Sequence, residues 1–255
     1  MDTFILTVGT VIVVAVLLAL FTRAQQRGHL IALRPLSPYQ VLQDQIGQAV
    51  ESGRQLHVTL GQAGLTGAAS PTSIAALTVL DTLAKDGCAN ATPPLVTVGE
   101  GTLLPAAQDS LLHAYNEAQF TSGFQPGAAQ FIAADTDPFT YAAGVTSVMH
   151  QGNVSNSIAV GRFGTEMALI TAAAARANAE QVIGADDPIA LALAHAVTDK
   201  VLIGEELLAA GAYLQGSPSQ LASVRVQDFL RLLITLIILG LAFYQLFTAF
   251  SGGLR

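Results

Sequence analysis

The chain has 255 residues, of which 51% are hydrophobic and 11% are charged, and its formal net charge is −7. Eighteen acidic against eleven basic residues exclude a generally basic, nucleic-acid-binding surface, and a single cysteine excludes an intrachain disulfide. A lone cysteine is typical of a reducing compartment, and we expect Cys88 to be a small apolar filler in a loop.

The first predicted element is an uncharged apolar segment that runs from about Phe4 to Thr22. Its length is close to the roughly 20 residues that a helix needs to cross a ~30 Å hydrocarbon core. A cleaved signal peptide would begin with positive charge, whereas the only charge before this segment is that of Asp2. We therefore predict a retained N-terminal transmembrane helix within residues 1–22.

A basic stalk follows in residues 23–38, with arginines at 23, 27 and 34. It ends in Pro35-Leu36-Ser37-Pro38, where each proline fixes φ and disfavours helix in the residue before it. The arginines would suit lipid headgroups, although a topology signal alone is the interpretation we prefer.

Residues 39–220 are predicted to form one Rossmann-like α/β domain. It opens with an amphipathic helix over Tyr39–Glu51, for which Gly53 is the expected C-cap. A unit then repeats six times: a short β-rich run that ends in Gly or an acid, followed by an Ala/Leu-rich helix. The expected strands are His57–Leu60, Leu95–Val98, Gln130–Ala133, Ser157–Val160, Gln181–Ile183 and Lys200–Ile203.

The helices between these strands carry recognisable start signals. Ser70, Asp137 and Asp187 each precede a proline, which is the order expected of a capping side chain and the first helical turn. The expected helices are Pro71–Lys85, Leu103–Gln119, Pro138–His150, Thr165–Asn178, Pro188–Val197 and Glu205–Leu214.

Near-continuous apolar strands that alternate with helices indicate a parallel sheet covered on both faces. The fold class is therefore α/β, a Rossmann-like, mostly parallel doubly wound sheet inserted between two transmembrane helices. An eight-stranded (β/α) barrel would need more units. The order of the strands is not predicted.

The strand-to-helix turns of such a sheet share one edge, where ligands usually bind. Here that edge is Gly-rich and acidic, with one cation. The candidate ligand-binding residues are Gly61, Gly64, Gly67, Gly99, Glu100, Arg162 and Glu166.

Gly61-x-x-Gly64-x-x-Gly67 lies after the first strand and before a helix, where backbone amides can hold a phosphate. The spacing differs from the dinucleotide fingerprint GxGxxG, and the acid at Glu100 comes later in the chain than in that motif. A tight turn with close packing is the alternative. A P-loop is excluded at this turn, because no Gly-Lys-Ser/Thr follows.

Carboxylates at the same edge are suited to Mg²⁺ or Ca²⁺, but acids also favour helix N-termini, and we prefer that interpretation. The five histidines form no HxxxH pair, no GxSxG elbow occurs, and Cys88 lacks an activating basic neighbour. We therefore predict no catalytic residue, no metal and no cofactor, with a nucleotide as the alternative ligand. The acidic residues of this edge of the sheet are Glu100, Asp135, Asp137, Glu166, Asp186, Asp187, Glu205 and Glu206.

Residues 221–255 contain the second transmembrane helix, with an apolar segment from about Phe229 to Phe250, and a short tail. Arg225 and Arg231 lie at its start, so the membrane-flanking arginines are Arg23, Arg27, Arg34, Arg225 and Arg231, with Arg255 beyond the second span. Basic residues flanking spans stay in the cytoplasm. We predict a two-span protein of the bacterial inner membrane with a cytoplasmic domain and both termini outside.

Six segments carry a resemblance to known sequences: SPYQ (37–40), GQAVESGRQLHVTLG (47–61), GLTGAA (64–69), PPLVTVGE (93–100), IGEELLAAGAYL (203–214) and LASVRVQDFLR (221–231). The chain resembles an uncharacterised family of membrane-anchored bacterial proteins, common in Chloroflexota-type genomes. The resemblance implies a Rossmann-like domain between two membrane spans, and it transfers no functional residue.

The expected function is a non-catalytic membrane scaffold or assembly subunit whose partners are the lipid bilayer and either further copies of the chain or another membrane protein. The alternative is a nucleotide-binding or small-ligand-binding sensor or enzyme that uses the Gly-rich edge. A channel is a third class, but two spans without a central ionisable residue would have to assemble into an oligomer to form a pore.

Overall fold

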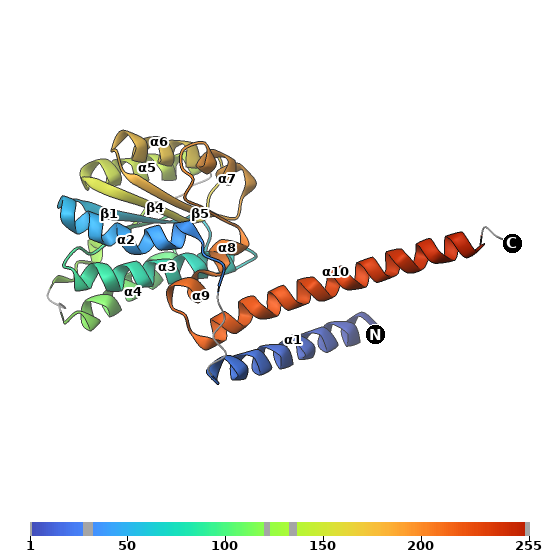
Figure 1. Cartoon of the computed structure of the whole chain (residues 1–255). Helices are drawn as coiled ribbons and strands as arrows, with labels where there is room; N and C mark the ends of the chain where they lie inside the picture. The colour runs from blue at the N-terminus through green and yellow to red at the C-terminus, as the bar shows by residue number, and fades with distance from the viewer. Residues whose placement is uncertain (1, 28–32, 120–122, 133–136, 253–255) are drawn as a thin grey trace. The chain divides into compact units, whose positions relative to one another are not determined.

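The computed structural model describes residues 2–27, 33–119, 123–132 and 137–252 (Figure 1). The chain divides into two compact units. One combines residues 1–33 with residues 216–255, and the other, here called the α/β unit, spans residues 34–215.

The first unit consists of two long helices, α1 (Asp2–Gln26) and α10 (Pro218–Gly252). Each is long and apolar enough to cross a membrane, judged by length and composition. The rings of Phe21 and Phe229 lie 6.3 Å apart where the two helices meet. Helix α10 begins earlier than the apolar segment, because the preceding residues up to Pro218 continue the same helix.

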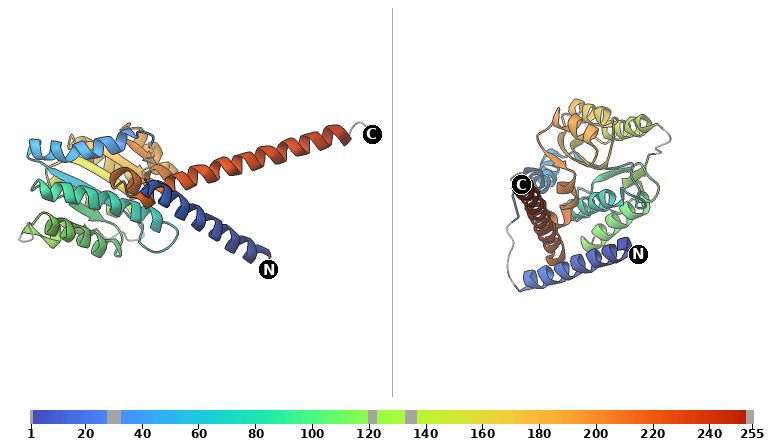
Figure 2. Two further views of the ribbon diagram at one scale, coloured as in Figure 1. Left: turned by 60° about the horizontal axis from the view of Figure 1, so that its bottom comes forward. Right: turned by 90° about the vertical axis from the view of Figure 1, so that its right-hand side faces the viewer.

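The α/β unit contains one sheet of six parallel strands in the order β3-β2-β1-β4-β5-β6 (Figures 1 and 2). This confirms the predicted fold class, and the order is that of the Rossmann fold. The strands are β1 (Gln55–Gly61), β2 (Leu95–Val98), β3 (Ala129–Phe131), β4 (Val154–Arg162), β5 (Glu180–Ala185) and β6 (Val201–Ile203). The expected strand residue Ala133 lies outside the described residues.

Helices cover both faces of the sheet, and each face has its own apolar core. The pleat of β1 directs Leu56, Val58 and Leu60 into the first core, which also contains the buried sides of α2, α3, α4, α8 and α9. The opposite core is built from α5, α6 and α7. The helices are α2 (Ser37–Ser52), α3 (Ser70–Ala89), α4 (Leu103–Glu117), α5 (Pro138–Gln151), α6 (Met167–Arg176), α7 (Pro188–His195), α8 (Glu205–Leu208) and α9 (Ala210–Leu214), with a 3-10 turn at Pro126–Ala128.

Most of the predicted helix signals are confirmed. Gly53 ends α2 in the left-handed conformation, with φ of 62°. The carboxylates of Asp137 and Asp187 cap α5 and α7 by accepting from Phe139 N–H and Ile189 N–H, respectively.

Three local predictions were wrong. Ser37 and Pro38 belong to α2 rather than to an extended stalk, because proline is accepted in the first helical turn. Ser70 lies inside α3, whose N-cap position is Ala69, so its side chain does not cap the helix. Cys88 is buried in the last turn of α3 rather than in a loop.

Two tyrosines tie together the ends of the α/β unit, and we call this pair the tyrosine clasp. The rings of Tyr39 and Tyr213 stack with centroids 4.8 Å apart. The Tyr213 hydroxyl donates to the carbonyl of Arg34 (2.8 Å), and that of Tyr39 donates to the carbonyl of Glu206 (2.7 Å). Burial, with the neighbouring Tyr213 and Glu206, raises the pKa of the Tyr39 phenol well above its usual range. The chain therefore enters and leaves the α/β unit near the turn that follows β6.

The α2 helix buries a polar side chain that its packing does not satisfy. Gln45 is fully buried, and neither its Oε1 nor its Nε2 has a hydrogen-bond partner among the described residues. We predict that Gln45→Met, which keeps the length of the side chain, raises the free energy of unfolding by about 1–2 kcal/mol. Urea denaturation in detergent micelles would measure this, with exposed Gln40→Met as the control. Equal stability of the two variants would contradict the prediction.

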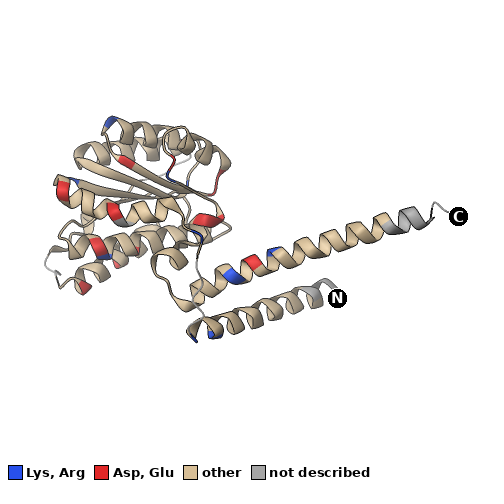
Figure 3. Cartoon of the chain, in the orientation of Figure 1, with Lys and Arg blue, Asp and Glu red and all other residues tan. Residues whose placement is uncertain are grey.

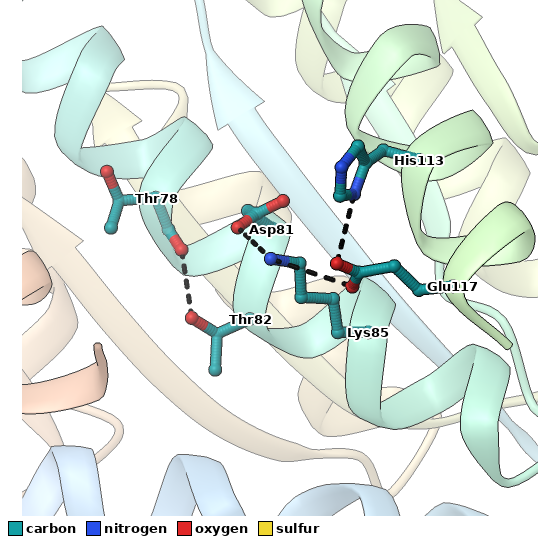
Figure 4. Close-up of polar contacts among 6 residues, drawn as sticks. All are labelled: Thr78, Asp81, Thr82, Lys85, His113 and Glu117. Carbon is teal, nitrogen blue, oxygen red and sulfur yellow. Dashed lines mark hydrogen bonds and ion pairs between the residues drawn. The ribbon is translucent and has the colours of Figure 1, made fainter.

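An exposed ion-pair network joins α3 to α4 (Figure 4). Lys85 Nζ lies 3.2 Å from Asp81 Oδ2 and 3.7 Å from Glu117 Oε2, and His113 Nδ1 lies 3.6 Å from Glu117 Oε1. Solvent screens such pairs, so we expect Lys85→Met to change the free energy of unfolding by less than about 1 kcal/mol in the same assay. A larger loss would show that the network organises the α3–α4 contact.

Candidate functional site

The candidate site is the space outside the carboxyl ends of β1 and β4, and we call this space the crevice. The chain connections diverge in opposite directions from these two central strands, and sheets of this kind bind ligands at such a switch point. Gly61 and Arg162 are register partners at the two strand ends. The turns after β1, β2, β4 and β5 surround this point, and we call the side of the sheet where all the strands have their carboxyl ends the carboxyl edge.

The backbones of the two central strands, which pair in parallel, approach each other very closely at this point. Gly61 and Gly161 have φ of 75° and 142°, and Gln62 N–H donates to the carbonyl of Arg162 (3.1 Å). A Cβ on Gly61 would lie 2.5 Å from the Arg162 carbonyl oxygen, and one on Gly161 would lie 2.2 Å from that of Leu60. The glycines are therefore required by backbone packing. Gly161 was not among the predicted site residues, because its role depends on which strand lies beside β4.

Glu166 connects the turn after β4 to the turn after β1. Its side chain is 3% exposed. Its Oε1 accepts from Gln62 Nε2 (3.0 Å) and from Gly164 N–H (2.8 Å). This carboxylate is thus engaged in holding two turns together.

Glu100 connects the turn after β2 to the turn after β1 in a similar way. Its Oε2 accepts from the backbone N–H of Thr102 (2.8 Å) and from the Thr102 hydroxyl, whose oxygen accepts from Leu65 N–H (3.0 Å). A Cβ on Gly64 would lie 2.7 Å from Glu100 Oε2, so this glycine makes room for the carboxylate.

Asp186 places a carboxylate at the N-terminus of α3. Its Oδ2 accepts from the Thr72 hydroxyl (3.0 Å), in the first turn of that helix, and lies 3.9 Å from Arg162 Nη1. A bound pyrophosphate would use a helix N-terminus of this kind. The sequence analysis counted Asp186 among the acids of the edge but not among the candidate ligand-binding residues. Its contact with Thr72 follows only from the position of β5 relative to α3.

The structure therefore brings together Gly61, Gly64, Glu100, Arg162 and Glu166 around one crevice. Gly99 joins them through its N–H, which donates to the Gly61 carbonyl (2.9 Å). Gly67 has φ of 92° in the turn before α3, and a Cβ there would meet no atom within 4 Å. It serves the turn rather than the crevice.

The remaining acids of the edge serve helix ends or lie apart. Asp137 and Asp187 are caps, and Glu206 Oε2 accepts from Ile203 N–H (3.1 Å). Asp135 lies outside the described residues. Across the described part of the chain, no group of three or more His, Cys, Asp or Glu side chains is placed to hold a metal ion.

A buried polar layer lies beneath the crevice, between β1, β2 and α5. His57 Nε2 pairs with Thr97 Oγ1 (3.0 Å), and the Tyr141 hydroxyl contacts Thr59 Oγ1 and the Thr97 carbonyl. Burial lowers the pKa of His57 to about 3 and raises that of Tyr141 to about 12. Both groups are neutral at physiological pH. Gly99 leaves room for the Tyr141 ring, so this layer supports the turns from below.

Comparison with known proteins gives one family and no function. A family model described as "Domain of unknown function (DUF6754)" matches residues 1–252. No curated protein and no solved structure matches the chain.

Proposed function

The chain belongs to the family described as a domain of unknown function (DUF6754), and from that premise we propose that it is a membrane-anchored, non-catalytic assembly subunit. The observation that supports this most is the internal bracing of the crevice. Glu100 and Glu166 bind the chain's own amides and hydroxyls, in positions where a nucleotide-binding protein would bind its ligand. Asp186 accepts from the Thr72 hydroxyl through Oδ2, while its buried Oδ1 has no hydrogen-bond partner among the described residues. On this proposal the crevice is a structural joint between the turns of the chain.

We further propose that the chain is a two-span protein of a bacterial inner membrane, in Chloroflexota-type organisms, with the α/β unit in the cytoplasm and both termini outside. The arginines near the span ends support this orientation. Helix α10 has 35 residues and is about 52 Å long, which exceeds a ~30 Å hydrocarbon core. Its first turns, with Arg225, Asp228 and Arg231, would therefore lie in the cytoplasmic headgroup region.

Assembly is supported by the apolar surface of the two helices. The apolar, membrane-span-length segments of α1 and α10 have none of their residues buried inside the structure. In a bilayer, such surfaces contact lipid or neighbouring helices. A homo-oligomer, or a complex with another membrane protein, would cover part of them.

Light scattering of the full chain in detergent tests the proposal. We expect a particle whose protein mass is at least twice 26.4 kDa, or exceeds 26.4 kDa by the mass of a co-purifying protein. A protein mass of one chain at all concentrations, without a co-purifying partner, would overturn it.

The alternative is a ligand-binding sensor or enzyme, which the Rossmann strand order favours. Thermal shift against ATP, GTP, NAD, NADP, FAD, Mg²⁺ and Ca²⁺ discriminates between the two. A ligand at one hundred times its Kd would stabilise the fold by about 2.7 kcal/mol, which would shift the midpoint by several degrees. The assembly proposal predicts a flat response across the panel, whereas a saturable shift would favour the sensor.

A further inference from the structure

Three large apolar side chains are exposed beside the edge strand β6. Ile189, in the first turn of α7, is 53% exposed, Ile203 at the end of β6 is 47% exposed, and Leu208 in α8 is 48% exposed. Ile203 ends β6, and Ile189 and Leu208 lie in the helices that follow the neighbouring strands β5 and β6, so all three lie toward the carboxyl edge. We call them the β6 patch. Exposed apolar side chains that gather at one place on a domain mark interaction sites.

Acidic residues neighbour the members of the β6 patch along the chain, and Figure 3 marks the acidic positions of the ribbon in red. Asp187 precedes Ile189, and Glu205 and Glu206 lie between Ile203 and Leu208. An acidic rim around an apolar centre selects a partner surface that is basic.

The backbone of β6 is not available for pairing with a further strand. The outward-facing Ile203 N–H already donates to Glu206 Oε2 (3.1 Å), and β6 has only three residues. Such features protect sheet edges against added strands. A partner would therefore bind the side chains of the patch, not its backbone.

The patch also adjoins the place where the chain leaves the α/β unit. The tyrosine clasp joins Arg34 to Tyr213 and reaches Glu206, which lies within the acidic rim. A partner at this place would be met close to the chain segments that lead into α1 and α10.

The unit formed by α1 and α10 carries a surface of complementary charge. Arg23 follows Phe21 by two residues and Arg225 precedes Phe229 by one helical turn, and these two rings are 6.3 Å apart. Arg27 and Arg231 extend the same region, and Asp228 is the acid among them. We call these four arginines the arginine collar.

We propose that the β6 patch docks on the arginine collar of a second copy of this chain. The inference rests on the proposed assembly function and names its interface. Charge complementarity favours this occupant over the bilayer itself, because an anionic leaflet would repel the acidic rim. Docking on the collar also requires a partner that is held at the membrane surface, and every further copy of the chain is held there by its own spans.

Lysine substitutions test the patch. Ile189→Lys and Leu208→Lys would put positive charge against the collar and weaken self-association of the full chain in detergent at least tenfold. Val50→Lys and Val197→Lys are the matched controls, because these side chains are 43% and 46% exposed but lie away from the carboxyl edge. Combining Leu208→Lys with Arg225→Glu is expected to restore association. An equal effect of all four lysines, or of none, would overturn the proposal.

Cross-linking separates contacts between copies from contacts within one chain. Two differently tagged copies, both carrying Cys88→Ser, are co-expressed, one with Ile203→Cys and the other with Arg225→Cys. A bismaleimide is expected to join the two tags in membranes. Absence of that product while the oligomer persists would overturn the interface and leave the assembly function standing, whereas a monomeric wild-type protein would overturn both. If Leu208→Lys removed a different co-purifying protein while the chain still associated with itself, this result would also contradict the proposal.

Discussion

Replacing Gly161 by alanine is expected to lower the free energy of unfolding of the α/β unit by about 4 kcal/mol or more, which is a large part of the roughly 5–15 kcal/mol that is typical of a domain. The residue has φ of 142°, and the new Cβ would lie 2.2 Å from the Leu60 carbonyl oxygen and 2.7 Å from its carbon. Because both atoms belong to the backbone of β1, relief would require the two central strands to separate. Urea denaturation in detergent micelles would measure the loss.

Gly101→Ala is the matched control for this substitution. It lies at the same edge, where a Cβ would meet no atom within 4 Å, and we expect a change below about 1 kcal/mol. If Gly161→Ala were as stable as Gly101→Ala, the close approach of the β1 and β4 backbones would be wrong, and with it the description of the crevice as a joint.

Acidification is expected to destabilise the chain through His57. Burial lowers the pKa of His57 to about 3 in the folded state, against 6.5 for an unperturbed histidine. Between these values the unfolded chain binds a proton that the folded chain does not, so stability falls as pH falls, by about 1.4 kcal/mol per pH unit well inside the window. From pH 7 to pH 5 we expect His57 to account for a loss of about 2 kcal/mol.

His57→Gln isolates this contribution. The variant keeps a polar atom near Thr97 but does not titrate, while the carboxylates of both proteins respond to pH alike. The difference in unfolding free energy between wild type and variant should shrink by about 2 kcal/mol from pH 7 to pH 5. A constant difference would show that His57 is accessible to protons in the fold.

The elements of the fold were largely predictable from the sequence, because the strands are short apolar runs and several helices have local signals. Asp137 and Asp187 illustrate this, since capping depends only on the next few residues. The short helix predicted over Glu205–Leu214 is two helices, α8 and α9, separated at Ala209. Signals of this kind fail at Ser70, where the residue before it takes the cap position.

The candidate site was predictable only as a set of turns. The contacts of Glu166 with Gln62 and of Asp186 with Thr72 join residues more than 100 positions apart in the chain. They follow from the strand order, which depends on packing of the whole sheet. A Gly-rich turn before a helix therefore suggested a ligand site. In the structure, Glu166 accepts from Gln62 of that turn, and the Thr102 hydroxyl accepts from its Leu65 N–H.

These contacts hold the turns around the crevice to one another. A carboxylate held by backbone amides is well placed to fix loop positions, and the buried layer of His57, Thr97 and Tyr141 supports the same turns. A rigid carboxyl edge would in turn present Ile189, Ile203 and Leu208 in constant positions. In the proposed assembly, the contacts around the crevice hold the edge of the sheet in the shape that the partner chain recognises at the β6 patch.

The mass of the particle in native membrane tests the central claim most directly. The full chain would be extracted with its surrounding lipid into polymer-bounded nanodiscs, without detergent, and its protein mass measured by native mass spectrometry after release. We predict discrete multiples of 26.4 kDa, alone or with a stoichiometric membrane partner. A single 26.4 kDa chain at native abundance would contradict the account.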